Sequence, residues 1–232
     1  MISLKEIFLT AFCIVLMVFC VKWKKLTIPG SIAAAVVGVS VYIGADLKGI
    51  FLLLIFFILS VLATTHKKAI KFDLAEDDGQ RNGRTAGQVF ANGGVAALTS
   101  LGAFFDPTHT ELYLLMMASS LASALSDTLS SELGIIYGSR FYNILTLKKD
   151  VKGQNGVVSL GGTLIGFVAS LFVGLCFAGF STAALLVCFS GFIGNLTDSI
   201  LGASLERKGI IGNNFVNFLN TLVAALAAVV LY

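Results

Sequence analysis

Two long apolar stretches of the chain each contain one aspartate, Ser123-Ala-Leu-Ser-Asp127-Thr-Leu-Ser-Ser-Glu132 and Gly191-Phe-Ile-Gly-Asn-Leu-Thr-Asp198-Ser199. An ionised carboxylate close to hydrocarbon is costly, so a membrane helix rarely carries one without a partner or a function. The residues around both aspartates are typical of membrane helices. Asp127 and Asp198 are therefore the first candidates for a functional site.

The composition of the whole chain indicates an integral membrane protein. Of its 232 residues, 56% are apolar and 12% are charged, and the mean hydropathy is +0.91, whereas a soluble domain carries roughly 25% charged residues. No polar stretch is long enough to form a separate soluble domain. We therefore expect a single all-α domain over residues 1–232, surrounded by the lipid bilayer. The small positive net charge does not indicate a nucleic-acid partner.

Eight apolar runs are candidate transmembrane helices. They are Ile7–Val21, Ile28–Ile43, Gly49–Thr65, Gly87–Phe105, Glu111–Ile136, Val157–Phe177, Ala183–Gly202 and Phe215–Tyr232. A straight span needs about 20 residues, and the second run is short and rich in glycine and alanine, so seven is the alternative count. The first run has no small-residue cleavage site before Lys22, which favours a retained helix over a signal peptide.

Basic residues alternate between the loops. Fourteen of the sixteen lysines and arginines follow the first, third, fifth or seventh run, and only Lys5 and Lys48 fall on the other side. The positive-inside rule therefore predicts that these four loops are cytoplasmic and that both termini lie outside. Trp23, between two lysines, fits an anchor at headgroup level. We expect a bacterial inner membrane, with the functional groups facing the cytoplasm.

Polar side chains gather toward the cytoplasmic ends of four runs. The groups are Arg84, Gln88 and Asn92; Ser119, Ser123, Asp127 and Ser131; Asn195, Asp198 and Glu206; and Asn213, Asn217 and Asn220. Within each group the spacing of three, four or eight residues puts the side chains on one helix face. Close helix packing explains serines alone, but it does not require a carboxylate. Glu132 lies five residues after Asp127 and joins it only if the helix ends or loosens near Gly134.

The loops add cations and glycines to these polar groups. One example is Lys152-Gly-Gln-Asn155-Gly156-Val-Val-Ser159-Leu-Gly161-Gly162-Thr163, which leads into the sixth run. A glycine-rich turn before a helix offers backbone N–H groups to an anion. Carboxylates that can hold Mg²⁺, with lysine or arginine nearby, form a phosphate-handling site. No Walker motif is present, so the prediction depends on the convergence of these groups.

Five segments together resemble one integral membrane family, in the order found in that family. They are Gly83–Gly93, Ser126–Gly134, Gly156–Thr163, Gly191–Ala203 and Asn213–Asn217. The family includes transmembrane protein 19 and the phytyl-phosphate kinase of plant tocopherol synthesis, and the match runs from about Ile28 to the C-terminus. The resemblance implies a kinase that phosphorylates an isoprenyl monophosphate to the diphosphate, with a nucleoside triphosphate (ATP or CTP) as co-substrate.

The resemblance and the chemistry of the residues together predict the site. We expect Asp127 and Asp198, with Glu132 as a third candidate ligand, to bind Mg²⁺ that bridges the nucleotide phosphates. Arg84 is expected to neutralise charge in the transition state, so the predicted catalytic residues are Asp127, Asp198 and Arg84. The predicted substrate- and nucleotide-binding residues are Lys67, Lys68, Gln88, Asn92, Ser159, Thr163, Asn214 and Asn217.

Two other functions share part of this evidence. A CTP-dependent nucleotidyltransferase acting on a lipid phosphate needs the same metal and basic groups, but it releases pyrophosphate rather than a nucleoside diphosphate. A lipid-phosphate transporter also uses intramembrane acids, but it should present polar groups to both faces. The outer loops, such as Asp106-Pro-Thr-His-Thr110, are nearly bare of charge, which favours the kinase. The sequence does not indicate the oligomeric state or the length of the isoprenoid chain.

Overall fold

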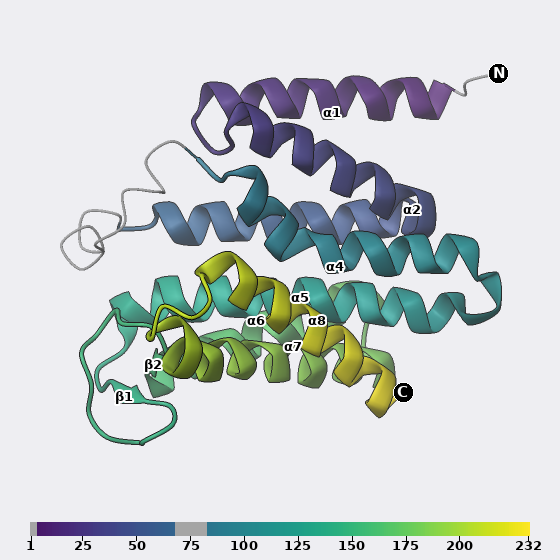
Figure 1. Ribbon diagram of the computed structural model, residues 1–232. Helices are drawn as coiled ribbons and strands as arrows, with labels where there is room; N and C mark the ends of the chain where they lie inside the picture. Colours follow the sequence, from purple (N-terminus) through teal and green to yellow (C-terminus); the bar gives the residue numbers. More distant parts are fainter. Residues whose placement is uncertain (1–3, 68–82) are drawn as a thin grey trace.

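The computed structural model describes residues 4–67 and 83–232, and helices dominate this part of the chain (Figure 1). The elements are α1 (Leu4–Lys22), α2 (Ile28–Thr65), α4 (Ala86–Phe105), the 3₁₀ turn η2 (Pro107–His109), α5 (Thr110–Tyr137), β1 (Tyr142–Asn143), β2 (Val157–Val158), α6 (Leu160–Ala178), α7 (Thr182–Leu201), the π-helical turn η3 (Gly202–Glu206) and α8 (Asn213–Leu231). Six helices of the described part are long and apolar enough to cross a membrane. The predicted all-α membrane fold is confirmed.

Helix α2 folds back on itself. Asp46 has non-helical torsions, φ 47° and ψ −149°. A Cβ placed on Gly49 would lie 2.6 Å from Cγ1 of Val41, although residues eight apart in a straight helix are about 12 Å apart. The chain therefore reverses at Asp46, and the two arms of α2 run in opposite directions (Figure 1). Counted this way, the described residues form eight long helical segments, which correspond to the eight predicted runs.

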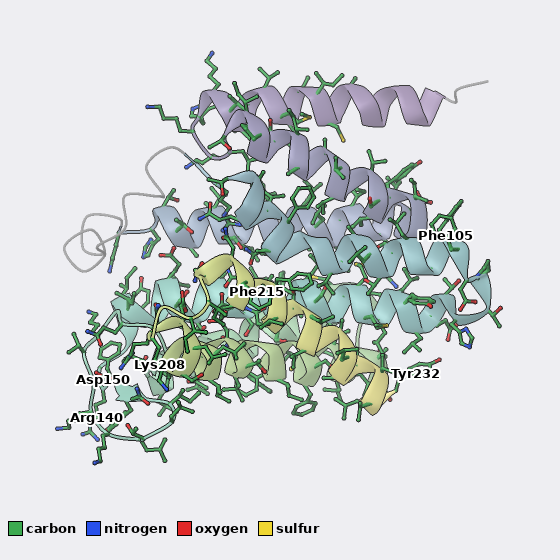
Figure 2. All side chains as sticks on the ribbon, viewed as in Figure 1. Phe105, Arg140, Asp150, Lys208, Phe215 and Tyr232 are labelled. Atoms are coloured by element: carbon green, nitrogen blue, oxygen red, sulfur yellow. The ribbon has the colours of Figure 1, made fainter. Side chains whose placement is uncertain are left out.

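The connections divide the bundle into two unlike ends. The α1–α2, α5–α6 and α7–α8 connections lie together on the left of Figure 1, and we call this side the loop end. The short α4–α5 turn and the C-terminus lie at the opposite end. Figure 2 shows Arg140, Asp150 and Lys208 at the loop end, with Phe105 and Tyr232 at the other. The basic connections therefore share one end, as their alternation predicted.

Helix α5 is the centre of the bundle. It contacts α2, α4, α6, α7 and α8, and almost every residue of its middle section is buried. Small residues allow this close packing, because a Cβ on Gly191 of α7 would lie 2.6 Å from Cβ of Ala122. The tight contact between α5 and α7 also brings their two intramembrane aspartates to the same level.

The α5–α6 connection differs from the sequence-based expectation. The sixth run was predicted to begin as a helix at Val157, but Val157 and Val158 pair as β2 with Tyr142 and Asn143 of β1 in an antiparallel arrangement. Helix α6 begins only after Ser159, whose Oγ accepts a hydrogen bond from the Gly162 N–H at 3.1 Å. The strand pair keeps the glycine-containing part of the connection close to the bundle.

Candidate functional site

A cavity of about 450 Å³ lies at the loop end of the bundle. Its wall is formed by α2, α4, α5, α6, α7 and α8, together with the α1–α2 and α5–α6 connections and the turn η3. The predicted site residues that line it are Arg84, Gln88, Asn92, Asp127, Glu132, Ser159, Thr163, Asp198 and Asn217. The polar faces of four separate helices therefore meet in one place.

The carboxyl groups of Asp127 and Asp198 lie within hydrogen-bonding reach of each other. Two ionised carboxylates in contact repel each other, so the pair needs a proton or a cation between its oxygens. Glu206, in the π-helical turn at the end of α7, adds further negative charge near Asp127 and is hydrogen-bonded to Asn213. The pair is therefore the centre of an acidic region on one side of the cavity.

Asn220 of α8 fixes the orientation of Asp198. Its Nδ2 donates to Oδ2 of Asp198 at 2.7 Å, while its Oδ1 accepts from Oγ of Ser123 at 3.1 Å. Asn220 and Ser123 are both fully buried. The predicted binding residues did not include Asn220, although an asparagine inside an apolar helix is a signal that could have identified it. This network connects α5, α7 and α8 directly beneath the acid pair.

Arg84 also lines the cavity. Its backbone N–H donates to the Lys25 carbonyl at 3.0 Å, and its carbonyl accepts from the Thr27 N–H at 3.0 Å. Its guanidinium carbon lies 5.7 Å from the centroid of the Phe56 ring. Burial lowers the pKa of Arg84 and the negative charge of Glu132 opposes that shift, but an arginine stays charged at neutral pH. The cavity therefore contains a permanent cation.

The structure does not assemble the predicted set of three metal-binding carboxylates. Across residues 4–67 and 83–232, no three Asp, Glu, His or Cys side chains are placed to hold one ion. Glu132 interacts electrostatically with Arg84. It follows Asp127 by five residues, and this spacing turns its side chain toward another part of the wall. What remains is a pair of carboxylates, Asp127 and Asp198, supported by amides.

This pair suits a magnesium ion. Mg²⁺ prefers oxygen ligands and is usually held by one or two carboxylates, with water and substrate phosphates completing its coordination. The described residues that line the cavity include carboxylates, amides and hydroxyls but no histidine or cysteine. The donor set therefore fits Mg²⁺ better than zinc, which is bound mainly by nitrogen and sulfur.

The glycine-containing turn over the cavity, Gly153–Gly156, is held against the end of α7. The guanidinium of Arg207 donates to the Asn155 carbonyl at 3.1 and 2.6 Å, and to Oδ2 of Asp150 at 2.7 Å. The hydrogen bond from Arg207 to Asp150 is the main reason that the pKa of Asp150 is below its usual value. Gly156 has φ 72°, and a Cβ there would overlap the backbone of Ala203. Only glycine fits this contact without strain.

Two of the predicted binding residues, Lys67 and Asn214, lie elsewhere. Lys67 does not line the cavity: it is exposed, with Nζ 5.0 Å from the ring centroid of Tyr137. Asn214 lies outside the main cavity, where α8 meets α4, and a Cβ on Gly87 would be 2.8 Å from its Nδ2. Lys68 lies outside the described residues. Helical spacing assigns residues to a helix face, but Lys67 lies beyond the end of α2. Its position therefore does not follow from that spacing.

Two of the lining residues also cap helices. Oε1 of Gln88 accepts from the Thr85 N–H at 2.9 Å, which completes a capping box at the start of α4. Ser159 caps α6 in a similar way. Each oxygen therefore already accepts one hydrogen bond, while the Gln88 amide N–H groups and the Ser159 hydroxyl proton can donate to a ligand.

The fold and the cavity define a helical membrane protein whose polar site lies at one end of the helix bundle. The chain belongs to the family described as integral membrane protein DUF92, whose family model matches residues 11–225. This finding confirms the family resemblance inferred from the motifs.

Relatives of the chain include archaeal and plant proteins. An uncharacterized membrane protein of Methanocaldococcus jannaschii is 34% identical over 218 residues, which cover 91% of this chain and 87% of that protein. The chloroplastic protein VTE6 of Arabidopsis thaliana is 32% identical over 216 residues, 89% of this chain and 65% of VTE6. Protein PGR of the same plant is 31% identical over 219 residues, 81% of this chain and 74% of PGR. No solved structure matches the chain.

Proposed function

We propose that this protein is a membrane-embedded phosphotransferase that converts an isoprenyl monophosphate to the diphosphate with a nucleoside triphosphate, ATP or CTP. The observation that carries the proposal is that the Asp127–Asp198 pair and Arg84 line a single polar cavity at the loop end. Membership of the family that contains VTE6 supports it, as does the motif resemblance to the family of the plant phytyl-phosphate kinase.

The residues of the cavity suit phosphoryl transfer. Asp127 and Asp198 would hold Mg²⁺, which when bound would neutralise and align the nucleotide phosphates. Asn220 keeps the Asp198 carboxyl group in one orientation, and Arg84 would stabilise negative charge on the transferred group. In the reaction, a phosphate oxygen of the acceptor forms a bond to the terminal phosphorus, and the bond to the nucleoside diphosphate breaks. The acceptor oxygen is already anionic, so no strong general base is required.

The position of the cavity suits one lipid and one water-soluble substrate. We place the loop end in the cytoplasm because the basic connections collect there. The isoprenyl tail would then lie along the apolar helices, and its phosphate would reach the cavity at the membrane boundary. The nucleotide would enter from the cytosol, close to the glycine-containing turn.

Product analysis by mass spectrometry tests the proposal. Purified protein would be incubated with Mg²⁺, ATP or CTP, and isoprenyl monophosphates of several lengths. We expect an isoprenyl diphosphate from the wild type, and a loss of about 10²–10³-fold in Asp127→Asn and Asp198→Asn. Asp106→Asn is the matched control, because Asp106 is bonded to His109 at the opposite end of the bundle. It should retain wild-type activity.

The other outcomes identify the competing functions. Wild-type activity in both cavity variants would show that the acid pair is not catalytic. A nucleotide–lipid adduct with release of pyrophosphate would indicate a nucleotidyltransferase. A folded protein that consumes none of the substrates would make lipid-phosphate transport the leading hypothesis.

A further inference from the structure

The turn between α1 and α2 adds two lysines to the cavity wall, Lys24 and Lys25. Helix α1 ends there because the N–H groups of Lys25 and Leu26 both donate to the Cys20 carbonyl, at 2.8 and 3.2 Å. Lys24 takes the left-handed conformation, φ 52°, at a position where helices commonly end in glycine. A lysine is strained in this conformation, which glycine adopts without strain.

Backbone pairing joins these lysines to Arg84. Residues Leu26 and Arg84 form a parallel bridge, and a Cβ on Gly83 would lie only 2.7 Å from the Leu26 nitrogen. Two segments far apart in the sequence therefore place three cations on one side of the cavity. We call Lys24, Lys25 and Arg84 the cationic wall. It contributes three basic side chains to the cavity that the acid pair also lines.

The cationic wall is next to the membrane-facing surface. Trp23, which also lines the cavity, is 53% exposed, and its ring centroid lies 3.6 Å from that of Phe19. Nζ of Lys22 lies 5.8 Å from the Trp23 ring. Aromatic rings with neighbouring lysines are typical of the headgroup level of a bilayer. An amphipathic ligand could therefore place an anionic head on the wall and its tail along α1 and α2.

We propose that the cationic wall is the subsite for the phosphate head of the lipid acceptor. The proposal rests on the proposed function and divides its two substrates, because it leaves the Gly153–Gly156 turn for the nucleotide. A phosphate offers several oxygens to the ammonium groups of Lys24 and Lys25 and to the planar guanidinium of Arg84. The division assigns the two lysines of the α1–α2 turn and the glycine-containing α5–α6 turn, which both line the cavity, to different substrates.

The fluorescence of Trp23 tests this subsite without turnover, because Trp23 is the only tryptophan in the chain. The protein would be placed in phosphatidylcholine nanodiscs and titrated with geranylgeranyl monophosphate in the absence of nucleotide. We expect a saturable change in emission. Lys25→Gln should weaken the apparent affinity about tenfold or more, since it removes a charge-assisted contact. Lys22→Gln is the matched control, because Lys22 lies in the same segment but does not line the cavity, and it should bind like the wild type.

Steady-state kinetics provides the second measurement. Lys25→Gln should raise the KM for the lipid phosphate while leaving the KM for the nucleotide unchanged. Lys24→Gly should have the same effect without straining the backbone, so lost binding in this variant is not a consequence of misfolding. Equal changes in both KM values would overturn the division of the two substrates.

The remaining titrations separate a specific subsite from a general anchor. An equal fluorescence response to geranylgeraniol, or to phosphatidylglycerol in the nanodisc, would show that the wall only anchors the protein at the membrane surface. A response to nucleotide alone would assign the wall to the nucleotide. If Trp23 does not respond in a protein that makes the diphosphate, the subsite is wrong and the proposed function stands. If charge-dependent binding occurs without any diphosphate, the subsite stands and the proposed function is wrong.

Discussion

Replacing Asn220 with alanine should strongly destabilise the bundle beneath the acid pair. The variant removes the donor that lies 2.7 Å from Oδ2 of Asp198 and the acceptor that lies 3.1 Å from Oγ of Ser123. A hydrogen bond to a charged group contributes about 1.5–3 kcal/mol, and an interhelical bond in a membrane protein about 0.6 kcal/mol. Ser123 stays fully buried and Asp198 stays partly buried, so we expect the free energy of unfolding to fall by about 2–4 kcal/mol.

Asn217→Ala is the matched control for this experiment. Asn217 lies on the same helix but is half-buried, and its Nδ2 is 3.5 Å from Oδ1 of Asn213, which is too long for a strong bond. Its loss should cost less than about 1 kcal/mol. Unfolding in mixed micelles with increasing sodium dodecyl sulfate, followed by circular dichroism, measures both variants.

A double-mutant cycle identifies the source of the loss. If Ser123 and Asn220 interact as the structure describes, Ser123→Ala should cost clearly less in the Asn220→Ala background than in the wild type, with a coupling of about 0.5–1 kcal/mol. Similar losses for Asn220→Ala and Asn217→Ala, together with zero coupling, would refute the proposal that this network holds α5, α7 and α8 together.

Three further predictions concern the loop end. Lys24→Gly should raise the free energy of unfolding by up to about 1 kcal/mol, because glycine adopts the observed φ of 52° without strain; a decrease in a thermal unfolding assay would contradict this. Gly156→Ala should increase hydrogen exchange in the α5–α6 connection far more than the control Gly209→Ala does. Both positions have positive φ, but an added Cβ meets a neighbour only at Gly156. Equal effects would show that the backbone strain of alanine at positive φ, and not the contact with Ala203, causes the change. The pKa of Asp150 is lowered mainly by its hydrogen bond with Arg207. The pair therefore stabilises the connection fully at pH values above the usual carboxyl pKa of 3.8. This contribution is lost as the pH falls through the lowered pKa that Asp150 has in the folded protein. Limited proteolysis between pH 3 and 6 should therefore show the connection loosening only at the acid end. Arg207→Gln should weaken this dependence, because Val151 and Asn143 also lower the pKa of Asp150.

Much of the architecture could be predicted because the bilayer restricts it. A chain in hydrocarbon must satisfy its backbone groups within helices, so apolar runs predicted the helical segments, and the alternation of basic loops predicted that they share one end. The expected loop between the second and third runs is instead a reversal at Asp46. The α5–α6 connection forms a strand pair, which depends on contacts that a hydropathy pattern does not contain.

The candidate site was predictable in its helices but not in its loops. A spacing of three or four residues identifies the face of a helix, so Asn92, Asp127 and Asp198 were expected together and all line the cavity. Lys67 was predicted in the site and Lys25 was not, although the structure places them the other way round. The positions of both depend on the turns that precede or follow a helix, where one left-handed residue redirects the chain.

The sequence by itself determined that this protein is a helical membrane protein with intramembrane carboxylates and one basic end. Those properties follow from the energetic cost of charge in hydrocarbon and from the period of the helix, both of which are local. Only the tertiary structure decided the partners: Asp127 with Asp198, Asn220 bonded to Asp198, Glu132 near Arg84, and Lys25 in the lining of the same cavity. Partners depend on which faces of different helices meet, and small residues such as Gly191 set that through close packing.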